Sequence, residues 1–426
     1  MVQIQIINAS EFTYERNLET GTAEQLTTVQ RIINDIKANG DQAVRNYTRQ
    51  FDKVEIDQLR VSEQEIQAAY QQLSPELIEI IRQAKENIRS YHEKQLQTSW
   101  FTTQENGNVL GQKVTPLDRV GVYVPGGTAA YPSSVLMNVL PAKIAGVKEI
   151  VMCTPPGREG IPAAILVAAN ECGVTEIYRV GGAQAVAALA YGTETIAKVD
   201  KITGPGNIYI AIAKKLVYGI VDIDMIAGPS EVLVACDESA EATYAAADML
   251  SQAEHDVLAA AYCVTLSRQK AKEIQQELTS QLAQLPRKDI AKESIEQQGK
   301  IIIAKDRSEM LRVINEIAPE HLEMMVEEPF SYLGEIRHAG AIFLGRYSSE
   351  PIGDYFAGPN HVLPTSGTAR FSSPLSVDDF IKKSSVIYYS RQALQENGSK
   401  IVAFANEEGL DAHGRAIAIR LEREGL

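Results

Sequence analysis

Most of the histidines in this chain lie in short polar clusters that could hold a metal ion or move a proton. Histidine is a common metal ligand, and its unperturbed pKa lies near neutral pH. Carboxylate or amide side chains accompany four of the six histidines. These clusters are residues 251–255, 319–321, 354–361 and 408–413. Their composition favours metal-assisted enzyme chemistry over a binding module.

The first candidate pair is Gln252 and His255, near the end of a predicted helix. Residues three apart share a helix face, so both side chains can point at one ion. Two ligands do not make a site. Asp354 and His413 could complete it, and such mixed oxygen and nitrogen donors would suit Zn²⁺. Distance along the sequence cannot show that these four residues converge, so the set of four is implied only by resemblance to a known family. The alternative is a hydrogen-bonded polar helix end, which is the commoner fate of such a pair.

The second candidate pair is Glu320 and His321, which follow Ala318-Pro319 and indicate a helix start or a tight turn. Adjacent residues on a helix point about 100° apart, so each would serve a different atom. A carboxylate that polarises water and an imidazole that takes a substrate proton form a workable division. A capped helix start is an equally good interpretation. Because there is no H-E-x-x-H motif, a metalloprotease is disfavoured.

The elements that must position these residues follow an alternating α/β pattern. Apolar runs end in glycine turns and are followed by helical stretches, which predicts a parallel sheet covered by helices. The runs are residues 120–124, 149–153, 177–180 and 201–203. A second such series spans residues 240–344, and the Gly- and Pro-rich segment 345–373 is predicted to be a functional loop. Strand-end glycine turns favour phosphates, but Gly204-Pro205-Gly206-Asn207 lacks the third glycine of G-x-G-x-x-G. We therefore expect a dinucleotide held in a non-standard way and, with the histidine clusters, a metal-assisted redox enzyme.

The N-terminal region is predicted to be mainly helical. Gly40 interrupts one helical pattern, and Ser74-Pro75 begins another helix, with Ser as the cap and Pro in the first turn. His92 lies towards the end of that helix and is expected on its surface.

Bulk properties exclude some classes of function. The chain of 426 residues is 45% hydrophobic and 23% charged, as in ordinary globular proteins. A net charge of -14 argues against binding to nucleic acid or to an anionic membrane. The four cysteines show no C-x-x-C spacing, so buried free thiols in a reducing compartment are expected. No secretory signal or membrane span is evident, which predicts a cytoplasmic protein.

A set of ordered motifs then gives the chain a family resemblance. From about residue 119 to 413 the chain contains VGVYVPGG, VGGAQAVAALAYGTE, VDKITGPGNIYI, DIDMIAGPSEVLV, SQAEHD, APEHLE, GDYFAGPNHVLPTSGTARF and EGLDAH. In these motifs it resembles the histidinol dehydrogenase family. One departure is local, because Val-Leu-Ala-Ala follows His255-Asp256 where many members carry a more polar stretch.

The resemblance implies a zinc-dependent oxidation of L-histidinol to L-histidine through L-histidinal, with two NAD⁺, as the last step of histidine biosynthesis. It implies one Zn²⁺ per subunit, held by Gln252, His255, Asp354 and His413, which also contact substrate. Glu320 and His321 would be catalytic, His321 as the base for the alcohol and Glu320 as the group that activates water. Substrate contacts would further include Ser230, His361 and Glu408, and NAD contacts would be Tyr123, Gln184 and Asn207.

The resemblance also implies an α/β fold with two Rossmann-like domains that lack the G-x-G-x-x-G fingerprint. The expected divisions are a mainly helical region 1–118, whose later part packs with the second α/β domain, an NAD-side domain 119–234, a zinc and catalytic domain 235–377, and a small C-terminal segment 378–426. That segment is expected to be exchanged in a homodimer, so that Glu408 and His413 serve the other subunit. Alternatives are a related zinc- and NAD-dependent dehydrogenase of another polar alcohol, a non-catalytic binder on the same scaffold, and a zinc hydrolase.

Overall fold

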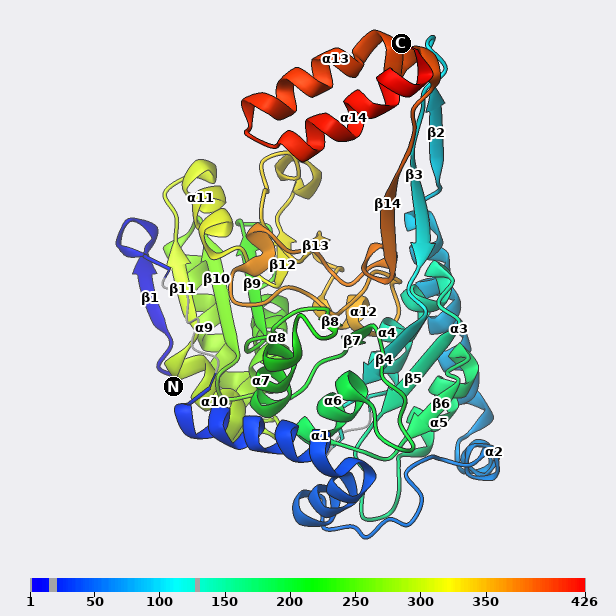
Figure 1. Ribbon diagram of the computed structural model, residues 1–426. Helices are drawn as coiled ribbons and strands as arrows, with labels where there is room; N and C mark the ends of the chain where they lie inside the picture. Colours follow the sequence, from blue (N-terminus) through cyan, green and yellow to red (C-terminus); the bar gives the residue numbers. More distant parts are fainter. Residues whose placement is uncertain (1, 15–20, 127–130, 426) are drawn as a thin grey trace. The chain divides into compact units, whose positions relative to one another are not determined.

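The computed structural model describes residues 2–14, 21–126 and 131–425, which form two compact units. Unit 1 comprises residues 1–95 and 117–380, and unit 2 comprises residues 96–116 and 381–426. The elements of unit 1 are labelled in Figure 1. It contains two parallel sheets, so the expected α/β class is confirmed.

The first sheet has five parallel strands in the order β6-β5-β4-β7-β8. Its strands are β4 (Arg119–Tyr123), β5 (Glu149–Cys153), β6 (Glu176–Tyr178), β7 (Lys201–Thr203) and β8 (Asp222–Ile223). Helices α4 (Pro132–Ala145) and α5 (Ala163–Cys172) cover one face, and α6 (Gly182–Tyr191) and α7 (Ile208–Val217) cover the other. The order reverses between β4 and β7, which is the switch point of a doubly wound sheet.

The second sheet has six parallel strands in the order β1-β11-β10-β9-β12-β13. They are β1 (Gln5–Asn8), β9 (Glu231–Cys236), β10 (Ala260–Thr265), β11 (Lys300–Ile303), β12 (His321–Met325) and β13 (Ala341–Leu344). Helices α8 (Ala242–Ala253), α9 (Arg268–Leu282) and α10 (Lys288–Gln297) cover one face, and α11 (Arg307–Ile317) covers the other. Strand residues alternate between the two cores, as the pleat requires: Val232 and Val234 face α8, and Leu233 and Ala235 face α11.

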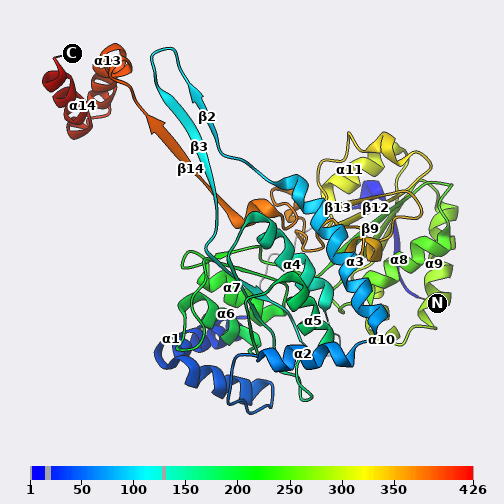
Figure 2. The ribbon, with the colours of Figure 1, turned by 90° about the vertical axis from the view of Figure 1, so that its right-hand side faces the viewer.

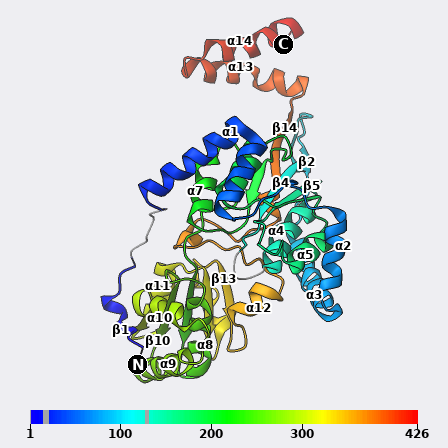
Figure 3. The same ribbon diagram turned by 90° about the horizontal axis from the view of Figure 1, so that it is seen from below.

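The N-terminal helices pack mainly against the helices of the first sheet, while Asn87 and His92, near the end of this helical region, also contact Phe356 and Asn360 of the second α/β region. They are α1 (Ala23–Phe51), α2 (Glu63–Gln72) and α3 (Pro75–His92). Helix α1 lies along α6 and α7, α2 against α5, and α3 against α4. Figure 3 shows α1 beside α7. The reason is that Ile32, Ile36 and Ile88 complete the apolar clusters of the first sheet. The start of the N-terminal region, in contrast, joins the second sheet, where it forms the edge strand β1 beside β11.

Local features of these helices follow the sequence, with one correction. Gly40 kinks α1 with a φ of 48°, and Ser74 caps α3 through Leu77 N–H at 3.1 Å. His92, expected on the surface, is fully buried. Its Nδ1 donates to the Ile88 carbonyl oxygen at 2.8 Å, so this nitrogen of the buried ring keeps a hydrogen-bond partner within its own helix.

Unit 2 combines a three-stranded antiparallel sheet with a helical hairpin (Figure 2). Its strands are β2 (Trp100–Thr103), β3 (Val109–Pro116) and β14 (Ile381–Tyr388), in the order β14-β3-β2, and its helices are α13 (Arg391–Glu407) and α14 (Asp411–Glu424). Large apolar side chains remain exposed on it, among them Trp100, Ile387 and Phe404.

Short elements complete the fold. They are η1 (Ala9–Glu11), η2 (Glu93–Gln95), η3 (Pro329–Tyr332), α12 (Glu350–Tyr355), η4 (Thr368–Arg370) and η5 (Val377–Phe380). All four cysteines are buried free thiols, as predicted. Among the helices of the described residues, none is both long and apolar enough to cross a membrane.

Candidate active site

The candidate site is built around the amino end of β12. Glu320 lies in a bend directly before this buried strand and His321 begins it, so the expected helix start is wrong. Strand β12 lies between β9 and β13, and His321 aligns with Val232 and Ala341. Because side chains alternate along a strand, His321 and Glu323 share the α8 face of the sheet.

The hydrogen bonding of His321 leaves one ring nitrogen available as a base. Its Nδ1 lies 3.0 Å from the Glu231 carbonyl oxygen. Since a carbonyl only accepts, Nδ1 carries the hydrogen and Nε2 keeps its lone pair. Burial lowers the pKa of His321 to about 4, so the ring is neutral at neutral pH. The Nε2 atom is buried without a hydrogen-bond partner in the described structure.

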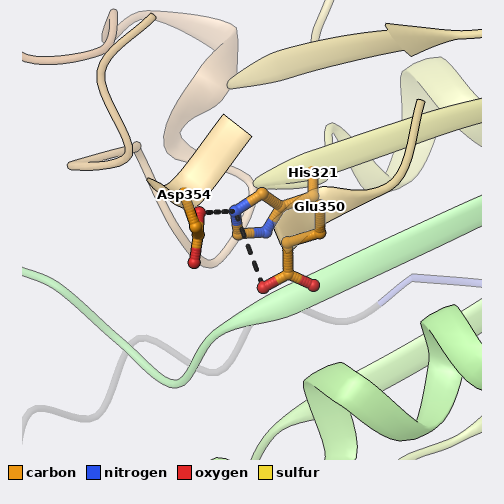
Figure 4. Close-up of side chains that lie close together, drawn as sticks. All are labelled: His321, Glu350 and Asp354. Atoms are coloured by element: carbon orange, nitrogen blue, oxygen red, sulfur yellow. Dashed lines mark ion pairs between the residues drawn. The ribbon is translucent and has the colours of Figure 1, made fainter. Parts of the chain in front are cut away.

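Two carboxylates of α12 face this nitrogen, as Figure 4 shows. His321 Nε2 lies 4.0 Å from Glu350 Oε1 and 3.9 Å from Asp354 Oδ1. The two acids are four residues apart, so they share one face of the short helix. Burial raises the pKa of Asp354 to about 7, and burial together with Asp354 and Asp248 raises the pKa of Glu350 well above its usual range.

The cluster fits a positively charged ligand. The facing atoms of His321, Glu350 and Asp354 all lie within 4.8 Å of one another. All three are acceptors, and no lysine or arginine forms a salt bridge with either acid in the part of the chain that the structure describes. A divalent cation or a substrate N–H or O–H group would supply the missing positive partner.

Two of the predicted metal ligands lie beside this cluster. Gln252 is fully buried in the last turn of α8. Its amide nitrogen, in the orientation that satisfies both groups, donates to Glu350 at 3.1 Å and 3.3 Å. His255 follows three residues later with an exposed side chain, and its charge is a minor cause, after burial, of the lowered pKa of His321 and of His361.

Glu320 is held next to His321. Its Oε2 accepts from Glu231 N–H at 2.9 Å and lies 3.8 Å from His321 Nδ1. Burial, followed by the charge of Glu350, raises its pKa well above the usual range. Once ionised, such a carboxylate is a stronger base than one at the surface.

His361 and Ser230 occupy adjoining segments. His361 Nδ1 donates to the Asp354 carbonyl oxygen at 3.1 Å, so its Nε2 is also free to accept or to bind a ligand. Ser230 directly precedes Glu231 at the start of β9, and its own carbonyl oxygen accepts from Ala260 N–H at 3.0 Å. A pocket of about 750 Å³ reaches His321, Asp354 and His361, with Phe343 and Leu363 among its apolar walls.

The last two of the predicted metal- and substrate-binding residues, Glu408 and His413, belong to unit 2. Glu408 directly follows α13, and His413 lies in the first turn of α14. Both side chains are exposed within that unit.

The predicted NAD residues gather at the carboxyl end of the first sheet. Tyr123 ends β4, Gln184 lies in the first turn of α6, and Asn207 caps α7 through Tyr209 N–H at 3.1 Å. The Tyr123 hydroxyl accepts from Gly182 N–H at 3.2 Å. Gln184 is 1% exposed, and neither polar atom of its amide has a partner in the described structure. Helix starts and an unpaired amide at a switch point suit a phosphate-bearing ligand.

Gly204 allows the turn after β7 to approach β4. Its φ is 118°, and an added Cβ would overlap the Tyr123 carbonyl oxygen. Asp224 Oδ2 accepts from Gly204 N–H at 2.8 Å, and Lys214 Nζ donates to the Gly204 carbonyl oxygen at 3.0 Å. Lys214 and Asp224 also form a buried ion pair, which fixes this turn.

Sequence reasoning missed Glu350 and its neighbours. Glu350 was hidden in a segment interpreted as an aperiodic loop, although its spacing of four from Asp354 was a detectable helical signal. Glu323 and Asp248 lie behind it, and burial raises the pKa of both carboxyl groups, to which their closeness to each other also contributes for Glu323.

Two doubly wound sheets, one with helix starts suited to phosphates and one with a buried histidine–carboxylate site, define an α/β enzyme of the nucleotide-binding type. Comparison with known proteins shows which family within this class the chain matches. The profile of the histidinol dehydrogenase family matches residues 15–421. The chain is 60% identical over 409 residues to histidinol dehydrogenase of Geobacillus kaustophilus, covering 96% of each chain. It is 58% identical over 424 residues to that of Halalkalibacterium halodurans, covering 99% of this chain and 100% of the relative.

A solved structure agrees over the full length. The crystal structure of histidinol dehydrogenase from Elizabethkingia anophelis matches with a TM-score of 0.95 and 39% identity, covering 100% of both chains. The chain therefore belongs to the histidinol dehydrogenase family, and the protein is an oxidoreductase.

Proposed function

We propose that the protein oxidises L-histidinol to L-histidine through L-histidinal, with two NAD⁺ and one Zn²⁺ per subunit, as the last step of histidine biosynthesis in the cytoplasm. The observation that carries the proposal is the free Nε2 lone pair of His321, which faces two buried carboxylates. When bound, NAD⁺ accepts hydride and the cation holds the imidazole and amine of the substrate.

His321 acts first as the general base. Its Nδ1–H is fixed on the Glu231 carbonyl oxygen, so Nε2 takes the proton from the oxygen of the substrate hydroxyl as hydride leaves the carbon that bears this hydroxyl. The aldehyde results from loss of one proton and one hydride. The neutral ring needed for this step is the form that burial favours.

Glu320 acts on water in the second half of the reaction. Its carboxylate takes a proton from the water that adds to the aldehyde carbon, which gives a hydrate. The hydrate then loses a second hydride and a proton to give the carboxylic acid. The single hydrogen bond from Glu231 N–H holds one carboxylate oxygen and leaves the other for water.

The ligand set proposed for Zn²⁺ is Gln252, His255 and Asp354 with His413 of the partner subunit. Supporting this set, Asp354 belongs to the cluster of acceptors in unit 1, Gln252 contacts Glu350 of that cluster, and His255 is near enough to His321 to affect its pKa. Glu408 of the partner subunit would contact substrate, together with Ser230 and His361. Exposed apolar side chains on unit 2 favour a homodimer in which this unit is covered. Tyr123, Gln184 and Asn207 would hold NAD⁺ at the first sheet.

The test is NADH formation by the purified protein with L-histidinol, compared with other amino alcohols. We expect two NADH per L-histidinol, loss of activity on chelation and recovery on addition of Zn²⁺. One NADH per substrate with accumulation of aldehyde would contradict the role of Glu320. Equal activity with amino alcohols that lack an imidazole would contradict the substrate assignment.

A further inference from the structure

Glu350 lies between the candidate metal ligand Gln252 and the candidate base His321. Its side chain is almost fully buried. In the orientation of the Gln252 amide that pairs donors with acceptors, its nitrogen donates to both carboxylate oxygens of Glu350, at 3.1 Å and 3.3 Å. With Glu350 ionised beside a bound cation, its carboxylate only accepts and an amide nitrogen only donates, so this contact decides which end of the amide faces Glu350.

Glu350 is itself fixed from the other side. Its backbone N–H donates to Glu323 Oε1 at 2.7 Å, and Glu323 lies two residues after His321 on the same face of β12. Glu323 in turn contacts Asp248, one helical turn before Gln252 on α8. These contacts link α8, β12 and α12 around the amide group of Gln252.

We propose that Glu350 is a positioning residue that holds the Gln252 amide with its carbonyl oxygen turned towards the bound cation. This inference rests on the proposed role of Gln252 as a metal ligand. Without Glu350, the amide can rotate by half a turn and present its NH₂ group, which a cation repels. Partners of metal ligands that set ligand orientation typically contribute about 10- to 100-fold to metal affinity.

The experiment measures Zn²⁺ affinity of the full-length apoprotein by competition with a chromogenic chelator, and the visible absorption spectrum after Co²⁺ loading. Glu350→Gln removes the charge but keeps an acceptor oxygen in place. Glu350→Asp keeps the charge but withdraws the acceptor by one methylene. We expect Glu350→Asp to weaken Zn²⁺ binding by at least about 10-fold and Glu350→Gln by no more than about 3-fold. We also expect a changed Co²⁺ spectrum in Glu350→Asp alone.

A double-mutant cycle tests whether Glu350 acts through Gln252. Gln252→Met removes the amide, so Glu350→Asp should cost no further affinity in that background. The same loss in both backgrounds would overturn the proposal, as would Glu350→Asp binding as tightly as the unmodified chain. A larger loss for Glu350→Gln than for Glu350→Asp would assign the effect to charge and would also overturn it.

Two further variants distinguish failure of this positioning role from failure of the proposed metal site. Glu176→Gln removes a partly buried carboxylate that pairs with Arg119 in the first sheet, so it should lower the melting temperature without changing Zn²⁺ affinity. If Gln252→Met and Asp354→Asn both leave Zn²⁺ affinity unchanged, the proposed metal site itself is wrong. If they weaken binding while Glu350→Asp does not, only the positioning role fails.

Discussion

The two parallel sheets of unit 1 share one strand order but are used at opposite ends. Apart from β1, β11-β10-β9-β12-β13 repeats the winding of β6-β5-β4-β7-β8. The first sheet gathers its candidate residues at the carboxyl ends of the strands, which is the usual place. The second gathers them at the amino ends of β9 and β12.

Helix direction gives this difference a physical meaning. At the carboxyl ends of the first sheet, α6 and α7 begin, and their free N–H groups favour anions such as phosphates. At the amino ends of the second sheet α8 ends, and the partial negative charge of a helix C-terminus favours cations. The same topology therefore offers an anion site at one end and a cation site at the other.

Loss of the base in the second sheet is expected to have the largest effect. His321→Ala removes the Nε2 acceptor, so both oxidations should slow by about 10²- to 10⁴-fold. Glu320→Ala should mainly block the second oxidation, because it leaves the alcohol base in place. Single-turnover NADH formation from L-histidinol and from L-histidinal separates the two steps. His338→Ala is the control and should leave both rates unchanged. Equal losses for both steps in both variants would contradict the division of labour.

In the first sheet, an added side chain in the turn after β7 should disrupt the approach of that turn to β4. Gly204→Ala combines a strained φ with overlap on Tyr123, and it should cost about 1–3 kcal/mol of stability and raise the KM for NAD⁺ by about 10-fold or more. Gly219→Ala is the matched control, because its φ is 96° but an added Cβ meets nothing within 4 Å. Urea unfolding and NAD⁺ titration measure both effects. A KM equally raised in both variants would show that strain alone, not the approach to β4, matters.

The contrast between the sheets also explains what the sequence could predict. Apolar runs that end in glycine define β5 and β7 with their exact bounds, and Gly40 and Ser74 mark the kink and the cap in the N-terminal helices. These features depend on local patterns. Strand β12 was missed because Glu323 interrupts its apolar run and Pro319 suggests a turn.

Other features depend on contacts that local patterns do not encode. The pairing of β1 with β11 joins residues almost three hundred positions apart, and the amphipathic pattern of α1 to α3 shows that a face is buried but not against which sheet. Convergence of Gln252, Glu350 and Asp354 likewise follows from the crossing of α8, β12 and α12. The family motifs pointed to two of these three residues, and only the structure pointed to Glu350.

A subtler change in the first sheet concerns Gln184. Its buried amide has no protein partner in the described structure, so Gln184→Leu removes no hydrogen bond from the fold. We expect unchanged or slightly higher stability and an increase of about 5- to 10-fold in the KM for NAD⁺. Melting temperature and NAD⁺ titration are the measurements. Asn138→Leu serves as the control, because its buried amide donates to the Ser134 carbonyl oxygen at 2.8 Å, and its loss should lower stability. A fall in stability for Gln184→Leu with unchanged KM would make the residue structural.

The smallest expected effect is on stability at acid pH. The pKa of a carboxyl group beside the second sheet is raised, whereas the pKa of one beside the first sheet is lowered. Burial raises the pKa of Asp354 beside the second sheet, whereas hydrogen bonding to Arg179 lowers the pKa of Glu65 to about 2 and ties α2 to the first sheet. A lowered folded pKa means that Glu65 stabilises the fold fully above its unfolded pKa, near 4.5, and that this contribution is lost as pH falls towards 2. Because the pair is partly exposed, solvent screening limits it to about 0.5 kcal/mol.

Glu65→Gln preserves an acceptor for the Ser62 N–H, so the variant isolates the charge. Urea unfolding at a series of pH values should show the full deficit at pH 7 and a shrinking one below the unfolded pKa of Glu65. Arg49 and Glu55 form a more exposed pair at 3.9 Å, and Glu55→Gln should show no comparable pH-dependent deficit. A deficit for Glu65→Gln that persists undiminished at the lowest pH would mean that the amide perturbs the helix cap, and the ionic link between α2 and the first sheet would then contribute nothing.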